Sequence, residues 1–146
     1  MNVYGKPSAY QVTQVSTSSK AKLILLMYDG AIRFINEARM KIETRDIAGR
    51  GVAISKAQKI IHELTVALDM NSGGEVAANL SRVYAQVTRH LINANIHGDM
   101  KELAVCLEIL APMREAWDQA INKAPAEQQA ASQFSDTQGR KVAISL

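Results

Sequence analysis

The chain has 146 residues, 47% of them apolar, which is enough for one domain with its own hydrophobic core and no disulfide or structural metal. Its 17 basic and 14 acidic residues give a net charge of +3 without a basic cluster, so the composition gives little support to nucleic-acid binding. A single cysteine excludes an internal disulfide, and we expect a cytoplasmic protein without membrane insertion, because neither a signal peptide nor a membrane-length apolar run is found.

The first 17 residues are expected to be extended and loosely held. Four segments with apolar residues at steps of three and four follow, and this spacing predicts amphipathic helices. The first three segments span residues 18–45, 51–69 and 75–97, and the fourth ends near residue 123. Glycines at positions 49 and 51, 73 and 74, and 98 mark the expected breaks between the helices.

The fourth helix has two local signals of its own. Asp99 and Glu102 have the spacing of a capping box at its start. Pro112 lies inside its apolar pattern, where the missing N–H predicts a kink or a restarted helix.

Short connections between long amphipathic helices favour antiparallel neighbours. The sequence therefore predicts an all-α fold, an antiparallel up-down four-helix bundle of residues 18–123. Residues 1–17 form an N-terminal segment that we expect to pack over the bundle. Residues 124–146 have little apolar surface to bury, which predicts a disordered tail.

No arrangement of residues in the chain is typical of an active site. Its histidines, His62, His90 and His97, stand in neither an HExxH motif nor a Glu-x-x-His pair, so we predict no metal centre. Phosphate-binding glycine motifs and the GxSxG motif of hydrolases are missing as well. Cys106 lies beside the fourth apolar pattern without a histidine on that segment, which favours a buried, inert thiol. We therefore expect a protein without catalytic residues or cofactor, not an enzyme.

Residues 23–28 are consecutively apolar, so the first helix is apolar in every direction there. The side that the other three helices cannot reach must be covered by the N-terminal segment, a second subunit or a partner. Leu23, Met27, Gly30 and Phe34 also form a second apolar stripe in which the glycine is a gap. Such a gap admits either a foreign segment in a groove or a neighbouring helix of the same bundle.

Four stretches of the sequence share one order and spacing with a known family. They are LILLMYDGAIRFI (23–35), ISKAQKIIHELTVALDMNSGGEVAANL (54–80), VYAQVTRHLINAN (83–95) and MREAWDQA (113–120). Over residues 10–122 the chain resembles the flagellin export chaperones, the FliS family. It departs from the family pattern at Lys20, Gln86 and Pro112, which lie at the edges of the expected groove and in the fourth helix.

The resemblance implies a cytosolic chaperone that holds the disordered C-terminal segment of flagellin in apolar grooves and prevents its polymerisation. The bound segment would then be delivered to the flagellar type III export apparatus, whose export gate is a second expected partner. The resemblance also implies that Tyr10 packs over part of the groove in the free protein. The candidate partner-binding residues are Tyr10, Leu23, Ile24, Met27, Tyr28, Gly30, Leu64, Leu68, Leu80, Tyr84 and Leu91.

Arg114 is a charge on the apolar stripe of the fourth helix and needs a partner, for which Asp29 and Asp118 are the candidates. The main alternative function is a homo-oligomerising bundle with a structural or adaptor role, in which a second copy covers residues 23–28. Weak self-association is compatible with the chaperone as well. A nucleic-acid-binding bundle is supported only by the basic balance, and we expect no nucleic-acid partner.

Overall fold

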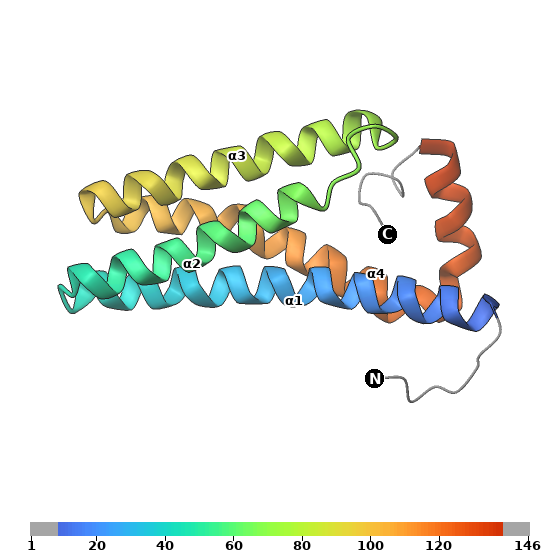
Figure 1. Cartoon of the computed structure of the whole chain (residues 1–146), viewed down its shortest axis with the longest axis horizontal. Helices are drawn as coiled ribbons and strands as arrows, with labels where there is room; N and C mark the ends of the chain where they lie inside the picture. The colour runs from blue at the N-terminus through green and yellow to red at the C-terminus, as the bar shows by residue number, and fades with distance from the viewer. Residues whose placement is uncertain (1–8, 139–146) are drawn as a thin grey trace.

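The computed structural model describes the backbone of residues 9–138 and the side chains of residues 19–122. Four helices follow one another along the chain: α1 (Ala9–Glu43), α2 (Ile47–Val66), α3 (Gly74–His97) and α4 (Met100–Gln138). Successive helices run in opposite directions (Figure 1). Helix α1 packs against α2 and α4, and α3 packs against the same two, so α1 and α3 stand diagonally across the bundle. The all-α, up-down bundle predicted from the periodicity is confirmed.

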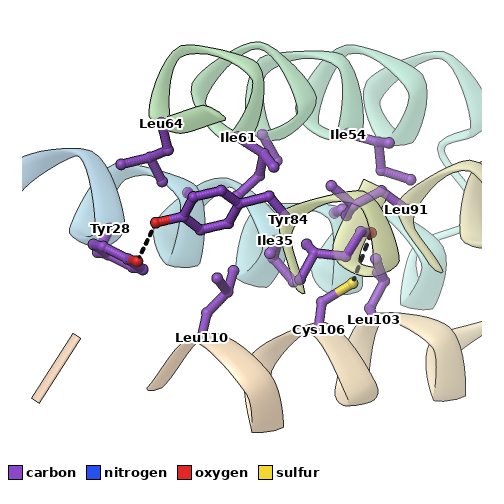
Figure 2. Close-up of a cluster of buried hydrophobic side chains, with 14 of the residues drawn as sticks. Tyr28, Ile35, Ile54, Ile61, Leu64, Tyr84, Leu91, Leu103, Cys106 and Leu110 are labelled. Carbon is purple, nitrogen blue, oxygen red and sulfur yellow. Dashed lines mark hydrogen bonds between the residues drawn. The ribbon is translucent and has the colours of Figure 1, made fainter. Parts of the chain in front are cut away.

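The core lies along the axis of the bundle, where each helix turns one apolar stripe inward (Figure 2). Its largest fully buried side chains are Tyr28, Tyr84, Ile35, Ile54, Ile61, Leu64, Leu91, Leu103, Leu110, Val87 and Cys106. Between residues 19 and 122 the half-buried Arg50 has its Nε out of contact with solvent, and every fully buried side chain is hydrophobic. Burial of such side chains contributes about 1.5–3 kcal/mol each and drives the assembly of the four stripes.

The turn between α1 and α2 differs from the expectation. Gly49 and Gly51 were expected to break the chain, but α2 already begins at Ile47. Asp46 is its N-cap, and its Oδ1 accepts a hydrogen bond from the Gly49 N–H at 2.8 Å. A Cβ at position 49 would collide with that carboxylate, so the glycine makes room for the cap instead of ending the helix.

At the junction of α3 and α4, Gly98 adopts the left-handed conformation with φ of 61° and ends α3. Asp99 accepts a hydrogen bond from the Lys101 N–H at 2.8 Å, as a residue preceding a helix does. The expected capping box is wrong in its second member, because Glu102 accepts from His90 Nδ1 on α3 at 2.5 Å.

Helix α4 continues without a break through Pro112, so of the two expectations, a kink or a restarted helix, the restart is wrong and the kink stays a prediction. Pro112 and Glu108, whose carbonyl loses its helical partner, are both exposed, and water can satisfy that carbonyl. Residues 124–138, expected to be disordered, are helical, in keeping with their alanine- and glutamine-rich sequence. In Figure 1 this last part of α4 turns steeply away from the rest of the helix.

Helix α1 begins at Ala9, so residues 9–17 are helical where an extended chain was expected. The expected packing of this segment over the bundle concerns side chains outside the described residues, and it stays a prediction. None of the helices in the described part of the chain has the length and hydropathy of a membrane-spanning segment.

Candidate partner-binding surface

The centre of the bundle holds two tyrosines from diagonal helices. The hydroxyls of Tyr28 on α1 and Tyr84 on α3 lie 2.6 Å apart, and the ring centroids are separated by 6.5 Å (Figure 2). Burial raises the pKa of both phenols, so both stay protonated and one donates to the other. Both were candidates for partner contact, but the structure places them in the core.

Four further candidates are also core residues. They are Ile24, Leu64, Leu68 and Leu91, none more than 7% exposed. Any apolar residue at helical spacing satisfies the same sequence pattern, so the pattern did not separate core from surface. In this conformation these side chains are not available to a partner, and their role is to hold the helices in place.

The second apolar stripe of α1 faces α2. A Cβ at Gly30 would lie 3.1 Å from Ile60 Cδ1, and Lys56 Nζ lies 5.4 Å from the centroid of the Phe34 ring. Both contacts fit one antiparallel register. Phe34 follows Gly30 by four residues on α1, and Lys56 precedes Ile60 by four residues on α2. The gap at Gly30 therefore admits a helix of the same bundle, the second of the two interpretations of this stripe.

The same register, followed in the other direction, sets residue 23 opposite residue 67, just beyond the end of α2 at Val66. Figure 1 shows α1 running on past this end of α2. Leu23 is consequently 56% exposed, and its neighbour Leu26 is 63% exposed. In this part of α1 the bundle covers the inner apolar stripe, which includes Ile24, and leaves the outer side of the helix exposed.

Exposed apolar side chains from α2 and its following turn lie at this end too. Val66 is 69% exposed and Met70 is 55% exposed. We refer to Leu23, Leu26, Val66 and Met70 as the end patch. Of these only Leu23 was a sequence candidate. Leu26 stands in the apolar run 23–28 and could have been found there, but no sequence pattern singled out Val66 and Met70 as exposed.

The remaining candidates have mixed positions. Met27 and Leu80 are half-buried and pack against the core. Tyr10 lies on α1, but its side chain is outside the described residues. Large exposed apolar side chains also occur at the opposite end of the bundle, at Met40, Ile47, Val52, Ile92 and Ile96, and no sequence candidate was placed there.

Arg114 joins α4 to α1 near the end patch. Its Nε donates to Asp29 Oδ1 at 2.7 Å, and its Nη1 lies 3.6 Å from Asp118 Oδ2. The hydrogen bond with Asp29 raises the pKa of the guanidinium, which is charged in any case. Both partners expected from the sequence are therefore present.

The described residues offer little for chemistry. Burial raises the pKa of the Cys106 thiol to about 12, and its Sγ donates to the Val87 carbonyl at 3.7 Å, so the thiol is inert as expected. Between residues 19 and 122 no three His, Cys, Asp or Glu side chains come together as metal ligands would. What the surface can do is bind apolar groups.

Comparison with known proteins shows the family to which the chain belongs. The family model described as "Flagellar protein FliS" matches residues 3–124. The chain is 35% identical over 121 residues to a protein of Bacillus subtilis named flagellar secretion chaperone FliS, covering 83% of this chain and 90% of that protein. It is 37% identical over 111 residues to the protein of the same name from Salmonella typhimurium, covering 75% and 82%. The chain belongs to the FliS family of flagellar proteins.

Proposed function

We propose that the protein is a flagellar export chaperone that binds the disordered C-terminal segment of flagellin in the cytosol and prevents its premature polymerisation. Membership of the FliS family carries the proposal, since the matched relatives are named flagellar secretion chaperones. The export gate of the flagellar apparatus is the second proposed partner. The protein acts as a binding protein and not as an enzyme.

The end patch supports this proposal, because it offers apolar surface beyond what the bundle covers. Leu23 lies level with the end of α2 and Leu26 one turn further into the bundle, and Val66 and Met70 are exposed at the same end. An amphipathic segment laid along α1 can bury these side chains as it folds. Coupled folding of this kind commonly buries about 1,000–3,000 Å² at an ordering cost of about 2–5 kcal/mol.

The six candidate residues in the core have a different role in this proposal. Ile24, Tyr28 and Tyr84 hold α1 and α3 in place behind the exposed turn of α1. Flagellin contacts fall to the outer side chains, Leu23 and Leu26 first and Met27 at the seam with α2. Tyr10 and the N-terminal segment cover this surface in the free protein.

Co-purification tests the proposal most simply. Full-length flagellin of the same organism should be retained by the tagged protein, and flagellin without its C-terminal segment should not. Equal retention of both would contradict the proposed site on flagellin. A tight dimer that retains neither would favour the alternative, a homo-oligomerising bundle in which a second copy covers the end patch.

A further inference from the structure

A second surface lies midway along the seam between α1 and α2. The half-buried ring of Phe34 has two cations over it, the Arg33 guanidinium at 4.9 Å and the Lys56 ammonium at 5.4 Å from the ring centroid. Lys59 is exposed one turn further along α2, and Val52, 54% exposed, lies one turn before Lys56. We refer to Arg33, Phe34, Val52, Lys56 and Lys59 as the seam site.

The three cations of the seam site lack a carboxylate partner among the described side chains. The ion pairs within 4.0 Å in that part of the chain are formed by Lys41, His90 and Arg114 instead. Glu37 has the i,i+4 spacing from Arg33 that permits an ion pair, yet the guanidinium lies over the Phe34 ring. Two of these cations, Arg33 and Lys56, thus lie over one aromatic ring.

The charge of the seam site is part of an uneven distribution over the bundle. Residues 19–73, which include α2 and the described side chains of α1, carry nine basic and six acidic residues. Residues 74–122 carry four basic and six acidic ones. Residues 19–73 therefore carry an excess of three positive charges, which favours an anionic partner.

We infer that the seam site binds an acidic amphipathic segment of a partner protein. An apolar side chain of that segment would pack on Phe34 and Val52, and its Asp or Glu side chains would lie against Arg33, Lys56 and Lys59. The ring between the cations favours a peptide over a simple anion, because it offers apolar contact as well as charge. This inference does not depend on the proposed role in flagellin binding.

A second copy of the chain fits the seam site less well. Of the described acidic side chains of α4, Glu102, Glu115 and Asp118 are already paired with His90 or Arg114, and only Glu108 is exposed without an ion pair. A contact between the α1–α2 face of one copy and α4 of another would also be heterologous and would not close into a dimer. A foreign acidic segment is the better match.

Binding of a labelled synthetic helical peptide, with leucine on one face and glutamate on the other, tests this inference by fluorescence anisotropy. We expect the wild-type protein to bind it and not the same peptide with lysine in place of glutamate. The double variant R33Q/K56Q should bind the peptide roughly tenfold more weakly. The control R89Q/K101Q removes two exposed cations without ion pairs, on α3 and α4, and should change affinity less than about twofold.

A second variant separates the aromatic ring from the charges. Phe34→Leu keeps most of the apolar volume and removes the cation–π contacts. It should therefore lower the affinity for the peptide several-fold and leave the circular dichroism spectrum of the protein unchanged. Equal affinity of the wild type and R33Q/K56Q would overturn the inference. So would binding of single-stranded DNA or phosphatidylglycerol vesicles in place of the peptide, or self-association that R33Q/K56Q abolishes while the peptide does not bind.

Discussion

The Tyr28 hydroxyl lies 2.6 Å from the Tyr84 hydroxyl and joins α1 and α3, two helices whose backbones are not in contact. Helices α1 and α3 stand on a diagonal, so this hydrogen bond crosses the bundle axis. It is buried among apolar side chains, where the Tyr84 hydroxyl depends on Tyr28 for a partner, while the Tyr28 hydroxyl also interacts with the Trp117 side chain. The pair therefore fixes the position of α1 relative to α3 just below the exposed turn at residues 23–26.

Replacing Tyr28 alone by phenylalanine should lower the free energy of unfolding by more than half of what replacing both tyrosines does. Tyr28→Phe leaves the Tyr84 hydroxyl buried without its partner, which we expect to lower the free energy of unfolding by about 1–3 kcal/mol. Tyr84→Phe should cost less, because the Tyr28 hydroxyl keeps the Trp117 side chain as a partner, and the double variant should lose less than the sum of the two. Urea unfolding of the four proteins measures this coupling, and strict additivity would show that the hydrogen bond contributes nothing.

Stability should fall at alkaline pH. Burial raises the pKa of Cys106 from 9.0 to about 12, and it raises the pKa of both tyrosines above 10.0. The unfolded chain thus releases these protons first, and the free energy of unfolding decreases as pH rises above about 9.

The test of this pH dependence is urea unfolding between about pH 7 and pH 11. Cys106→Ala should flatten the first part of the decrease, between the ordinary thiol pKa and that of the tyrosines. The comparison uses the slope with pH, because the substitution also leaves a small cavity. A stability that is level over this range in the wild type would contradict the assigned burial.

Gly30 should tolerate only a small side chain. A Cβ there would meet Ile60 Cδ1 at 3.1 Å, which a rotation of that methyl can relieve. Gly30→Ala also gains helix propensity of about 1 kcal/mol, so we expect a nearly neutral change. Gly30→Leu should destabilise by about 1–3 kcal/mol, and Ile60→Ala in the same chain should restore part of that loss. Thermal unfolding that shows no rescue would place Gly30 away from α2.

Two apolar residues of α2 allow a core position to be compared with a surface position. Leu64 is 2% exposed and Val66 is 69% exposed. Leu64→Ala should lower the free energy of unfolding by about 2–5 kcal/mol, while Val66→Ala should change it by less than about 0.5 kcal/mol. If Leu64→Ala instead kept its stability and lost flagellin binding, Leu64 would be a contact residue.

The periodic apolar residues predicted the four helices and most of the core, because burial of one stripe per helix is a local property of the sequence. The helix ends were harder to predict. Asp46 starts α2 before the glycines that were expected to end a helix, and exposure lets Pro112 remain within α4. The Gly49 N–H is satisfied by the Asp46 carboxylate, and the Glu108 carbonyl is open to water, so neither backbone group is left without a partner.

The binding surface was predicted in part. Leu23 was identified because six apolar residues cannot all face one core, and its exposure agrees with that argument. Tyr28 and Leu64 fit the same apolar pattern but lie in the core. The register of α1 on α2 is what distinguishes them from Leu23. The end of α2 at Val66 and the gathering of cations around Phe34 depend on contacts between helices, which the sequence pattern does not specify.

Calorimetric titration of the flagellin C-terminal segment into the wild type and two matched variants tests the central claim most directly. Leu26→Asp places a charge in the end patch, and Ile96→Asp places one at the opposite end, on side chains that are 63% and 65% exposed. Both should leave the fold intact. The proposed site predicts that Leu26→Asp weakens binding at least about tenfold, or about 1.4 kcal/mol, while Ile96→Asp binds like the wild type. Unchanged binding by Leu26→Asp, with or without a loss in Ile96→Asp, would contradict it.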